Sequence, residues 1–217
     1  MALRVACLAI LCLALMAIPA GAQVLYENGP VNGTNDAWPL NHGYFVDDTF
    51  TLTGNSTVGG IDFYTWEFQG DSLTSVDWSI TFKPNSGTLY GSGTASGKNL
   101  TDSFISVNQY GYDIDKVTIS GLNVSLAGGR YWLNLLNATV PSGNPVYWDE
   151  NDGVGCHSVG CPSLATEDGS EGSIGSESFD VFGTSGGGTT PEPSSFLLLA
   201  SGVLGLAGVL RRKGGCR

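Results

Sequence analysis

The sequence predicts an all-β protein whose central domain is an antiparallel β-sandwich of jelly-roll type. Three observations lead to this prediction. Short stretches alternate between apolar and polar residues, clusters rich in Gly, Pro, Asn and Ser separate these stretches, and no helical period occurs outside the two terminal hydrophobic segments. The part between those segments, Gln23 to about Thr190, has some 168 residues, which is enough for one hydrophobic core.

The clearest predicted strand is Val76–Lys83, in which every second residue is apolar and the residues between are polar. Similar patterns predict strands at 44–52, 60–68, 88–95, 103–110, 115–120, 123–126, 130–137 and 178–182. Turn-forming clusters at 83–87 and 127–129 separate some of them. We therefore expect the ectodomain to extend over residues 23–183.

The first 22 residues predict a secretory signal peptide. Arg4 precedes an apolar run of 14 residues, 5–18, and Pro19-Ala20-Gly21-Ala22 is a small-residue pattern that signal peptidase accepts. A membrane anchor is the alternative, but the run is short for a membrane span. We expect signal peptidase to cut between Ala22 and Gln23.

The C-terminal end has three parts. Residues 184–190 form a Gly-rich linker, and Pro191-Glu192-Pro193 then holds the chain extended. Residues 194–210 are 17 uncharged residues that predict a transmembrane helix, and Arg211-Arg212-Lys213 follow directly. Because positive residues stay in the cytoplasm, we expect the tail to anchor the protein in the inner membrane with the ectodomain outside.

This combination resembles the PEP-CTERM sorting signal of exported bacterial proteins, over Pro191 to Arg217. The resemblance implies a transient anchor, which exosortase, a membrane cysteine transpeptidase, recognises and cuts nearby. It also implies delivery to the cell surface or extracellular matrix, with exopolysaccharide as a candidate partner. Segments 126–133, 146–151 and 176–179 resemble PEP-CTERM ectodomains as well, which implies no particular activity.

The ectodomain is strongly acidic. Between Gln23 and Thr190 it has four basic residues and 19 acidic ones, a net charge of −15. Nucleic-acid binding depends on clustered Lys and Arg, so this charge excludes nucleic acid as an expected partner. It suits a surface protein, or one that binds calcium.

Cys156 and Cys161 are predicted to form a disulfide, since the protein leaves the cytosol and the pair closes a short loop. Zinc is the alternative, but only His157 and the distant His42 offer further ligands, and zinc needs three or four.

The segment Trp148–Gly153 contains the densest group of hard oxygen ligands. Asp149, Glu150, Asn151 and Asp152 make it a candidate site for a structural Ca²⁺. An ordinary solvated turn has the same composition, so that reading stays open. Asp47-Asp48 and Asp113-Ile114-Asp115 carry weaker versions of the same argument. No other cofactor is expected.

Five tryptophans, at positions 38, 66, 78, 132 and 148, could stack on sugar rings. The alternation around Trp78 places it in the core, whereas Trp66 and Trp148 lie near polar loops and are the candidate glycan-stacking residues. Most large aromatic side chains belong to the core, and that alternative applies to both.

The sequence contains no His-Glu-x-x-His motif, and we expect no enzymatic activity. The expected function is a structural or adhesive role outside the cell. The alternative is a carbohydrate-active hydrolase on a jelly-roll scaffold, which would need two carboxylates about 5–10 Å apart in a cleft lined by Trp.

Overall fold

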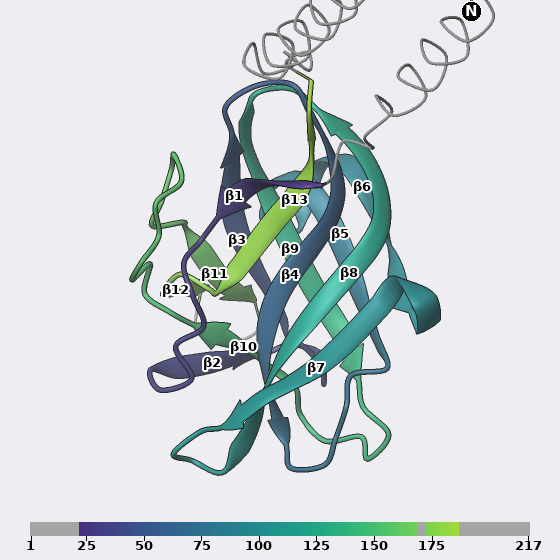
Figure 1. The fold of residues 1–217 in the computed structure, drawn as a ribbon, viewed down its shortest axis with the longest axis vertical. Coiled ribbons are helices and arrows are strands. Elements are labelled where there is room, and N and C mark those ends of the chain that lie inside the picture. The colour runs from purple at the N-terminus through teal and green to yellow at the C-terminus, as the bar shows by residue number, and fades with distance from the viewer. Residues whose placement is uncertain (1–21, 169–171, 187–217) are drawn as a thin grey trace, which may run out of the picture. The chain divides into compact units, whose positions relative to one another are not determined.

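The computed structural model describes residues 22–168 and 172–186, which form two antiparallel β-sheets (Figure 1). The first sheet contains β7 (Leu100–Val107), β8 (Tyr112–Leu126), β4 (Ser56–Phe68), β13 (Phe179–Ser185), β1 (Gln23–Glu27), β10 (Tyr147–Glu150) and β2 (Asp36–Pro39). The second contains β12 (Gly172–Ile174), β11 (Ala165–Asp168), β3 (Phe45–Leu52), β9 (Gly129–Thr139), β5 (Ser75–Lys83) and β6 (Ser86–Ser96). The only helical element in these residues is the 3-10 turn Gly97–Asn99.

Several sequence predictions concern residues that the structure does not describe. The signal peptide, the linker beyond Gly186 and the predicted helix 194–210 are among them. The domain itself extends slightly further than predicted. β13 continues to Ser185 because this residue still pairs with Ser56 of β4.

Strand β4 is the centre of the first sheet. Along one edge it pairs with β8 over its whole length, from Ser56 to Phe68. Along the other edge it pairs first with β13 and then, at Thr65 and Trp66, with β10. The other six strands of this sheet are thereby joined, directly or through one neighbour, to these two edges.

The inward faces of both sheets form one hydrophobic core. Strands β4 and β8 lie in front of β3, β9 and β5 in Figure 1. All five strands contribute buried side chains that alternate along the strand. The innermost members are at most 1% exposed: Ile61, Phe63, Val117 and Ile119 from the first sheet, and Val46, Phe50, Ile80, Leu133 and Leu135 from the second. This confirms the all-β, antiparallel and sandwich-like prediction, and the jelly-roll type stays a prediction.

The longer predicted strands are present with two instructive differences. The segments 115–120 and 123–126 are one strand, β8, because Gly121 takes a positive φ of 78° and lets pairing with β4 continue past it. In β5 the predicted alternation ends before Phe82, which is 56% exposed, whereas Thr81 is buried. The pairing of β5 with β6 shifts register on both sides of Thr81, and such a bulge turns the following side chains over.

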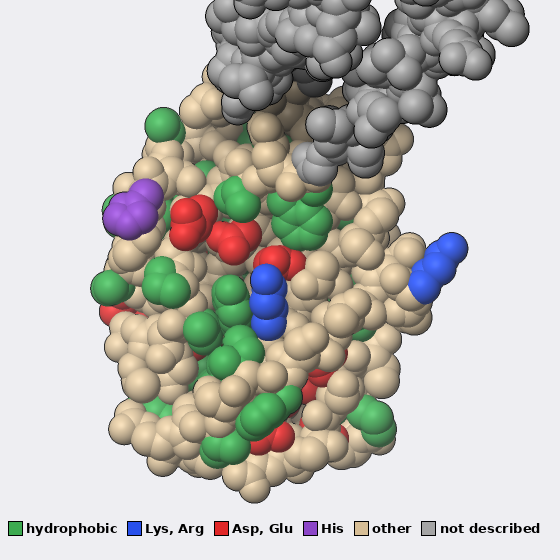
Figure 2. Space-filling view, in the orientation of Figure 1, with side chains coloured by type: hydrophobic (Ala, Val, Ile, Leu, Met, Phe, Trp, Pro, Cys, Tyr) green, Lys and Arg blue, Asp and Glu red, His purple; other side chains and the backbone are tan. Residues whose placement is uncertain are grey.

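Acidic side chains lie both on the surface and inside the domain. The face in Figure 2 shows red carboxylates with few blue basic side chains near them. Inside, Asp47, Asp48 and Glu177 are at most 1% exposed. Asp48 accepts hydrogen bonds from the backbone N–H groups of Thr49 (2.6 Å) and Glu177 (2.8 Å). Neither carboxylate oxygen of Glu177 has a hydrogen-bond partner among the described residues.

Burial raises the pKa of these groups because the charged form loses hydration. It raises the pKa of Asp47 to about 7 and that of Asp48 to about 7. For Glu177 the pKa is raised well above its usual value, by burial first and then by the charge of Asp48. Near neutral pH these buried carboxyl groups therefore keep protons that they would release in the unfolded chain.

We expect the protein to lose stability as the pH rises from 5 to 8. The raised folded-state pKa values mean that the stabilising contribution is complete below pH ~4 and is lost as the pH passes through about 7. Each carboxyl protonated only in the folded state gives a slope of up to about 1.4 kcal/mol per pH unit. Urea unfolding at successive pH values measures this slope. Asp47→Asn should flatten it and the exposed Glu27→Gln should not; a free energy of unfolding that rises over this range would contradict the prediction.

Candidate functional site

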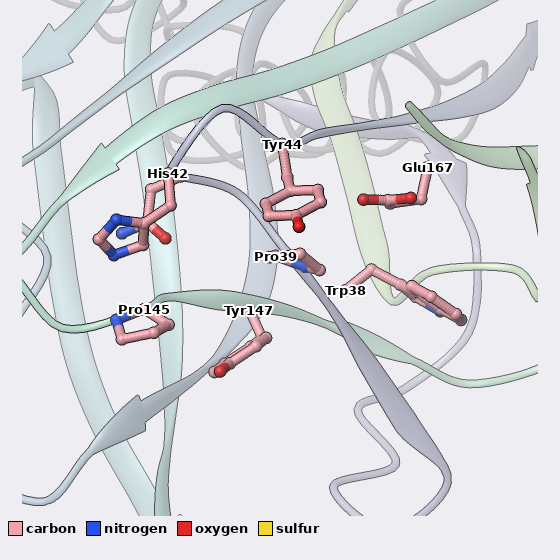
Figure 3. Close-up of a pocket in the computed structure, with 8 residues that line it drawn as sticks. Trp38, Pro39, His42, Tyr44, Pro145, Tyr147 and Glu167 are labelled. Atoms are coloured by element: carbon pink, nitrogen blue, oxygen red, sulfur yellow. The ribbon is translucent and has the colours of Figure 1, made fainter. Parts of the chain in front are cut away.

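A groove of about 420 Å³ is lined by residues of both sheets. Its lining is mostly rings, and Figure 3 shows Glu167 at one end and His42 with Pro145 at the other. The lining residues are Trp38, Pro39, Asn41, His42, Tyr44, Pro145, Tyr147 and Glu167. Three of the rings are aromatic side chains with exposed area, and we call this feature the aromatic groove.

The pairing of β2 with β10 positions the first part of the lining. Pro39 lies directly opposite Tyr147 in this pair, and Trp38 lies opposite Trp148. The half-buried Trp38 donates a hydrogen bond from Nε1 to Oε2 of Glu150 at 2.6 Å, which fixes the indole ring. Proline suits β2 because this strand has no further neighbour beyond β10 in its sheet.

A tight turn between β2 and β3 positions the second part. The backbone N–H of Tyr44 donates to the carbonyl of Asn41 at 3.1 Å, and His42 and Gly43 between them have positive φ values of 60° and 94°. Two successive positive φ values are typical of a type I′ turn, in which Gly is favoured. The turn leaves Tyr44 38% exposed at the start of β3.

Asn41 holds this turn against the rest of the domain. Its buried side chain donates to the backbone carbonyls of Ala138 (3.2 Å) and Asn144 (3.0 Å), and accepts from the backbone N–H of Val146 (3.3 Å). One amide therefore satisfies three backbone groups from two other segments. It fixes the floor of the groove.

Tyr147 connects the aromatic groove to further rings. It meets Tyr112 edge-on, with ring centroids 5.8 Å apart, and Tyr112 in turn contacts Phe68 at 5.2 Å. Burial raises the pKa of the Tyr147 hydroxyl, so this group stays neutral and offers a hydrogen-bond donor. Chemically, the groove can bind an apolar ring face and hydrogen-bond polar groups around it.

The predicted stacking residues are not the exposed ones, and this prediction needs correction. Trp148 is 0% exposed, because it packs edge-on against Phe63 and Phe179 and donates from Nε1 to the carbonyl of Ser178. Trp66 is 6% exposed, because Tyr110 stacks on it at 5.7 Å. Neither ring offers a free face to a sugar.

The sequence reasoning missed Tyr44 and Tyr147 and did not single out Trp38 among the five tryptophans. The available signals were the Trp38-Pro39 pair and the His42-Gly43 turn, which mark a strand end and a turn. For Trp78 the prediction was right, since it is 9% exposed and belongs to the core.

The predicted calcium loop, Trp148–Gly153, uses its ligands for other contacts. Asp149 is 0% exposed and accepts hydrogen bonds from the backbone N–H groups of Asn32 (2.7 Å) and Gly33 (2.6 Å) and from Nε1 of Trp66 (2.7 Å). Asn151 is buried and donates to the carbonyl of Asn28 at 2.7 Å. These donors offset part of the local negative charge, and calcium binding by this loop stays a prediction.

The other two acidic members of that loop are engaged as well. Glu150 accepts from Trp38, and the exposed Asp152 accepts from the side chain of Asn35 at 2.8 Å. Burial raises the pKa of Glu150 and of Asp149. Asp47 and Asp48, the weaker candidates for calcium binding, are the buried carboxyl groups described above.

Cys156 and Cys161 form a disulfide, as predicted. Both sulfur atoms are therefore bonded to each other and neither is a thiolate ligand for zinc. The loop that they close is attached to β1 through a hydrogen bond from the backbone N–H of Glu27 to the hydroxyl of Ser158, at 2.8 Å.

The all-β domain is followed in the sequence by an apolar segment and a basic end, the arrangement of an ectodomain with a C-terminal sorting tail. Residues 189–213 match the family model of the PEP-CTERM protein-sorting motif, which confirms the resemblance of the tail. This motif implies an exported protein that passes the membrane toward the cell surface and is processed by exosortase. The chain matches none of the curated proteins with which it was compared.

The match leaves the membrane helix itself a prediction. Residues 194–210, which were predicted to form it, fall within the matched motif but outside the described residues. Within residues 22–168 and 172–186 no helix is long and apolar enough to cross a membrane.

We expect Asn41→Ala to destabilise the domain by about 1–3 kcal/mol, because it leaves three buried backbone groups without partners. Asn123→Ala is the matched control, since that side chain is exposed and should change stability by less than about 0.5 kcal/mol. Urea unfolding of both variants measures the difference. Equal stability of the two variants would show that Asn41 does not hold the groove.

Proposed function

We propose that this chain is a cell-surface or extracellular-matrix protein whose ectodomain binds a glycan in the aromatic groove and has a structural or adhesive role. The single observation that carries the proposal is the clustering of Trp38, Tyr44 and Tyr147 around one cavity. The C–H face of a sugar ring is apolar and packs on such rings, while its hydroxyls need nearby donors and acceptors. The sandwich, of jelly-roll type in this proposal, serves as a rigid scaffold for the groove.

The volume and the charge of the groove limit the class of ligand that it can bind. A volume of about 420 Å³ lies within the roughly 300–1,000 Å³ of small-molecule sites and fits one or two sugar rings. The groove contains a carboxylate, Glu167, and the domain carries four basic and 19 acidic residues. A polyanionic polymer would be repelled by this field, so the proposed ligand is a neutral glycan, such as part of a bacterial exopolysaccharide.

We propose binding without hydrolysis. Glycoside hydrolysis uses two carboxylates on either side of the scissile bond. Glu167 is the one carboxylate among the residues that line the groove. The observation that would have favoured the hydrolase, a carboxylate pair in a cleft lined by Trp, is not met by this lining.

The route to the surface completes the proposal. Signal peptidase cuts before Gln23, the tail anchors the chain in the inner membrane, and exosortase cuts near Pro191–Pro193. The matched sorting motif at 189–213 supports the last step.

Retention by neutral polysaccharides tests the groove. In affinity electrophoresis through gels that contain dextran, mannan or a β-glucan, we expect the protein to be slowed by at least one of them and not by anionic alginate. Tyr44→Ala should weaken the retention about two- to tenfold, as expected for the loss of one ring contact. Tyr90→Ala is the matched control, because Tyr90 is 40% exposed and Tyr44 38%, but Tyr90 lies on β6 outside the groove.

Two results would contradict the glycan proposal. One is the absence of retention by every neutral polymer, and the other is an equal loss of retention in Tyr44→Ala and Tyr90→Ala.

The tail is tested separately. We expect the double change Pro191→Ala and Pro193→Ala to hold the protein in the inner membrane, because the motif that exosortase recognises is lost. Ser201→Ala, which leaves the prolines and the basic end intact, should be released normally. Cell fractionation followed by mass measurement of the released chain gives the outcome. Release of the double variant at its normal mass, or a released wild-type chain that still ends at Arg217, would refute exosortase processing.

A further inference from the structure

Three acidic side chains converge at one end of the first sheet. Glu67 lies near the end of β4, Asp115 on β8 and Asp102 on β7, three strands that are neighbours in that order. One carboxylate oxygen from each lies within 4.8 Å of the other two. Among the described residues, these three side chains form the one group of at least three Asp, Glu, His or Cys residues that lie close enough to share an ion.

The free oxygens of this cluster are buried. Glu67 is 0% exposed and Asp115 is 5% exposed. Oε2 of Glu67, Oδ1 of Asp102 and Oδ2 of Asp115 have no hydrogen-bond partner among the described residues. Buried polar atoms normally find partners, and one cation would supply a partner to these three carboxylates, which come within 4.8 Å of one another.

The second oxygen of two of these groups is anchored. Oε1 of Glu67 accepts a hydrogen bond from the Thr65 hydroxyl at 2.8 Å. Oδ2 of Asp102 accepts from the Ser72 hydroxyl and from the backbone N–H of Leu73, both at 2.7 Å. Outer hydrogen bonds of this kind orient metal ligands. They restrict the rotation of the Glu67 and Asp102 carboxylates.

Among the described residues, no salt bridge joins a basic side chain to this cluster. Lys116, next to Asp115 in sequence, lies on the opposite face of β8 and pairs with Asp62 at 2.6 Å. Burial, followed by the charge of Asp102, raises the pKa of Glu67 to about 8 and that of Asp115 to about 7. Without a cation the carboxylates repel one another.

We propose that Glu67, Asp102 and Asp115 bind one Ca²⁺ ion that ties β4, β8 and β7 together. The donor set consists of hard carboxylate oxygens, which calcium prefers over softer ligands. Oxygens bound at about 2.3–2.6 Å from one ion lie at most about 5 Å apart, and the three oxygens here lie within 4.8 Å. Water or other oxygens complete the six to eight ligands that calcium takes.

Calcium binding to the full chain, purified in mild detergent, tests the proposal. We expect isothermal titration with CaCl₂ to give one site per chain, and the thermal midpoint to be higher in Ca²⁺ than in EGTA, since binding to the folded state alone stabilises it. Mg²⁺ should bind more weakly, because it requires shorter distances and a stricter octahedron.

Two isosteric changes locate the site. Asp115→Asn and Glu67→Gln each remove one negative charge while keeping the shape of the side chain, and each should weaken Ca²⁺ binding at least about tenfold. Asp152→Asn is the control, since it removes a carboxylate from the Trp148–Gly153 loop and should leave the affinity unchanged.

The wild-type titration keeps the test decisive even if a variant fails to fold. No calcium binding up to 1 mM (roughly the level of extracellular modules) would overturn the proposal and leave shared protons as the counter-charge. Loss of binding in Asp152→Asn with unchanged binding in the other two variants would place the ion in the loop and would overturn it as well. Sugar retention is a separate readout, so failure of this proposal is distinguishable from failure of the glycan proposal.

Discussion

The register of strand β4 is the constraint on which the rest of the domain depends. Ile61, Phe63 and Glu67 alternate along its inner face, while Trp66 points the other way and receives Tyr110. Side chains on a strand change face at every residue, so a shift of one position would expose the core and bury the outer face. β4 also pairs with β10 at Tyr147 and Trp148, which aligns the groove with the core. Core, groove and acidic cluster therefore share one alignment.

This acidic domain satisfies many of its buried carboxylates with hydrogen bonds from neutral donors. Within the described residues the one salt bridge is that of Lys116 with Asp62. Neutral donors take over the task elsewhere: the indole N–H groups of Trp38 and Trp66 donate to Glu150 and Asp149. Indole is large, apolar and has one donor, so each of these rings packs and compensates charge at once. The tryptophans act here as hydrogen-bond donors as much as packing residues.

Structural features could be predicted from the sequence where they depend on residues close together in the chain. The strands of the central sheets follow from alternation, and the disulfide follows from compartment and spacing. β2 and β10 have four residues each, too few to show a period, and the aromatic groove depends on their pairing. Trp66 and Trp148 show the limit for side chains. Their neighbours in sequence are polar, but their burial is decided by Tyr110, Phe63 and Phe179 from other segments.

The acidic cluster illustrates the same limit. Its members come from three strands, and only Asp115 stood in a local acidic pattern, with Asp113. The buried donors around Asp149 could not be read locally either, since two of them are backbone groups of Asn32 and Gly33. Composition correctly indicated that carboxylates are abundant and cations scarce. It did not show which carboxylates would be left without a donor.

The position of β1 bears on the timing of export. In its sheet β1 pairs only with β13, and β13 separates it from β4. In export that starts from the N-terminus, as the proposed signal peptide implies, β1 would emerge without a neighbour in its sheet until β13 had followed. In that order of export the sheet is complete only after the residues up to Ser185 have crossed, just before the sorting motif begins at residue 189. A protease that cuts within β13 would therefore remove the one strand with which β1 pairs in its sheet.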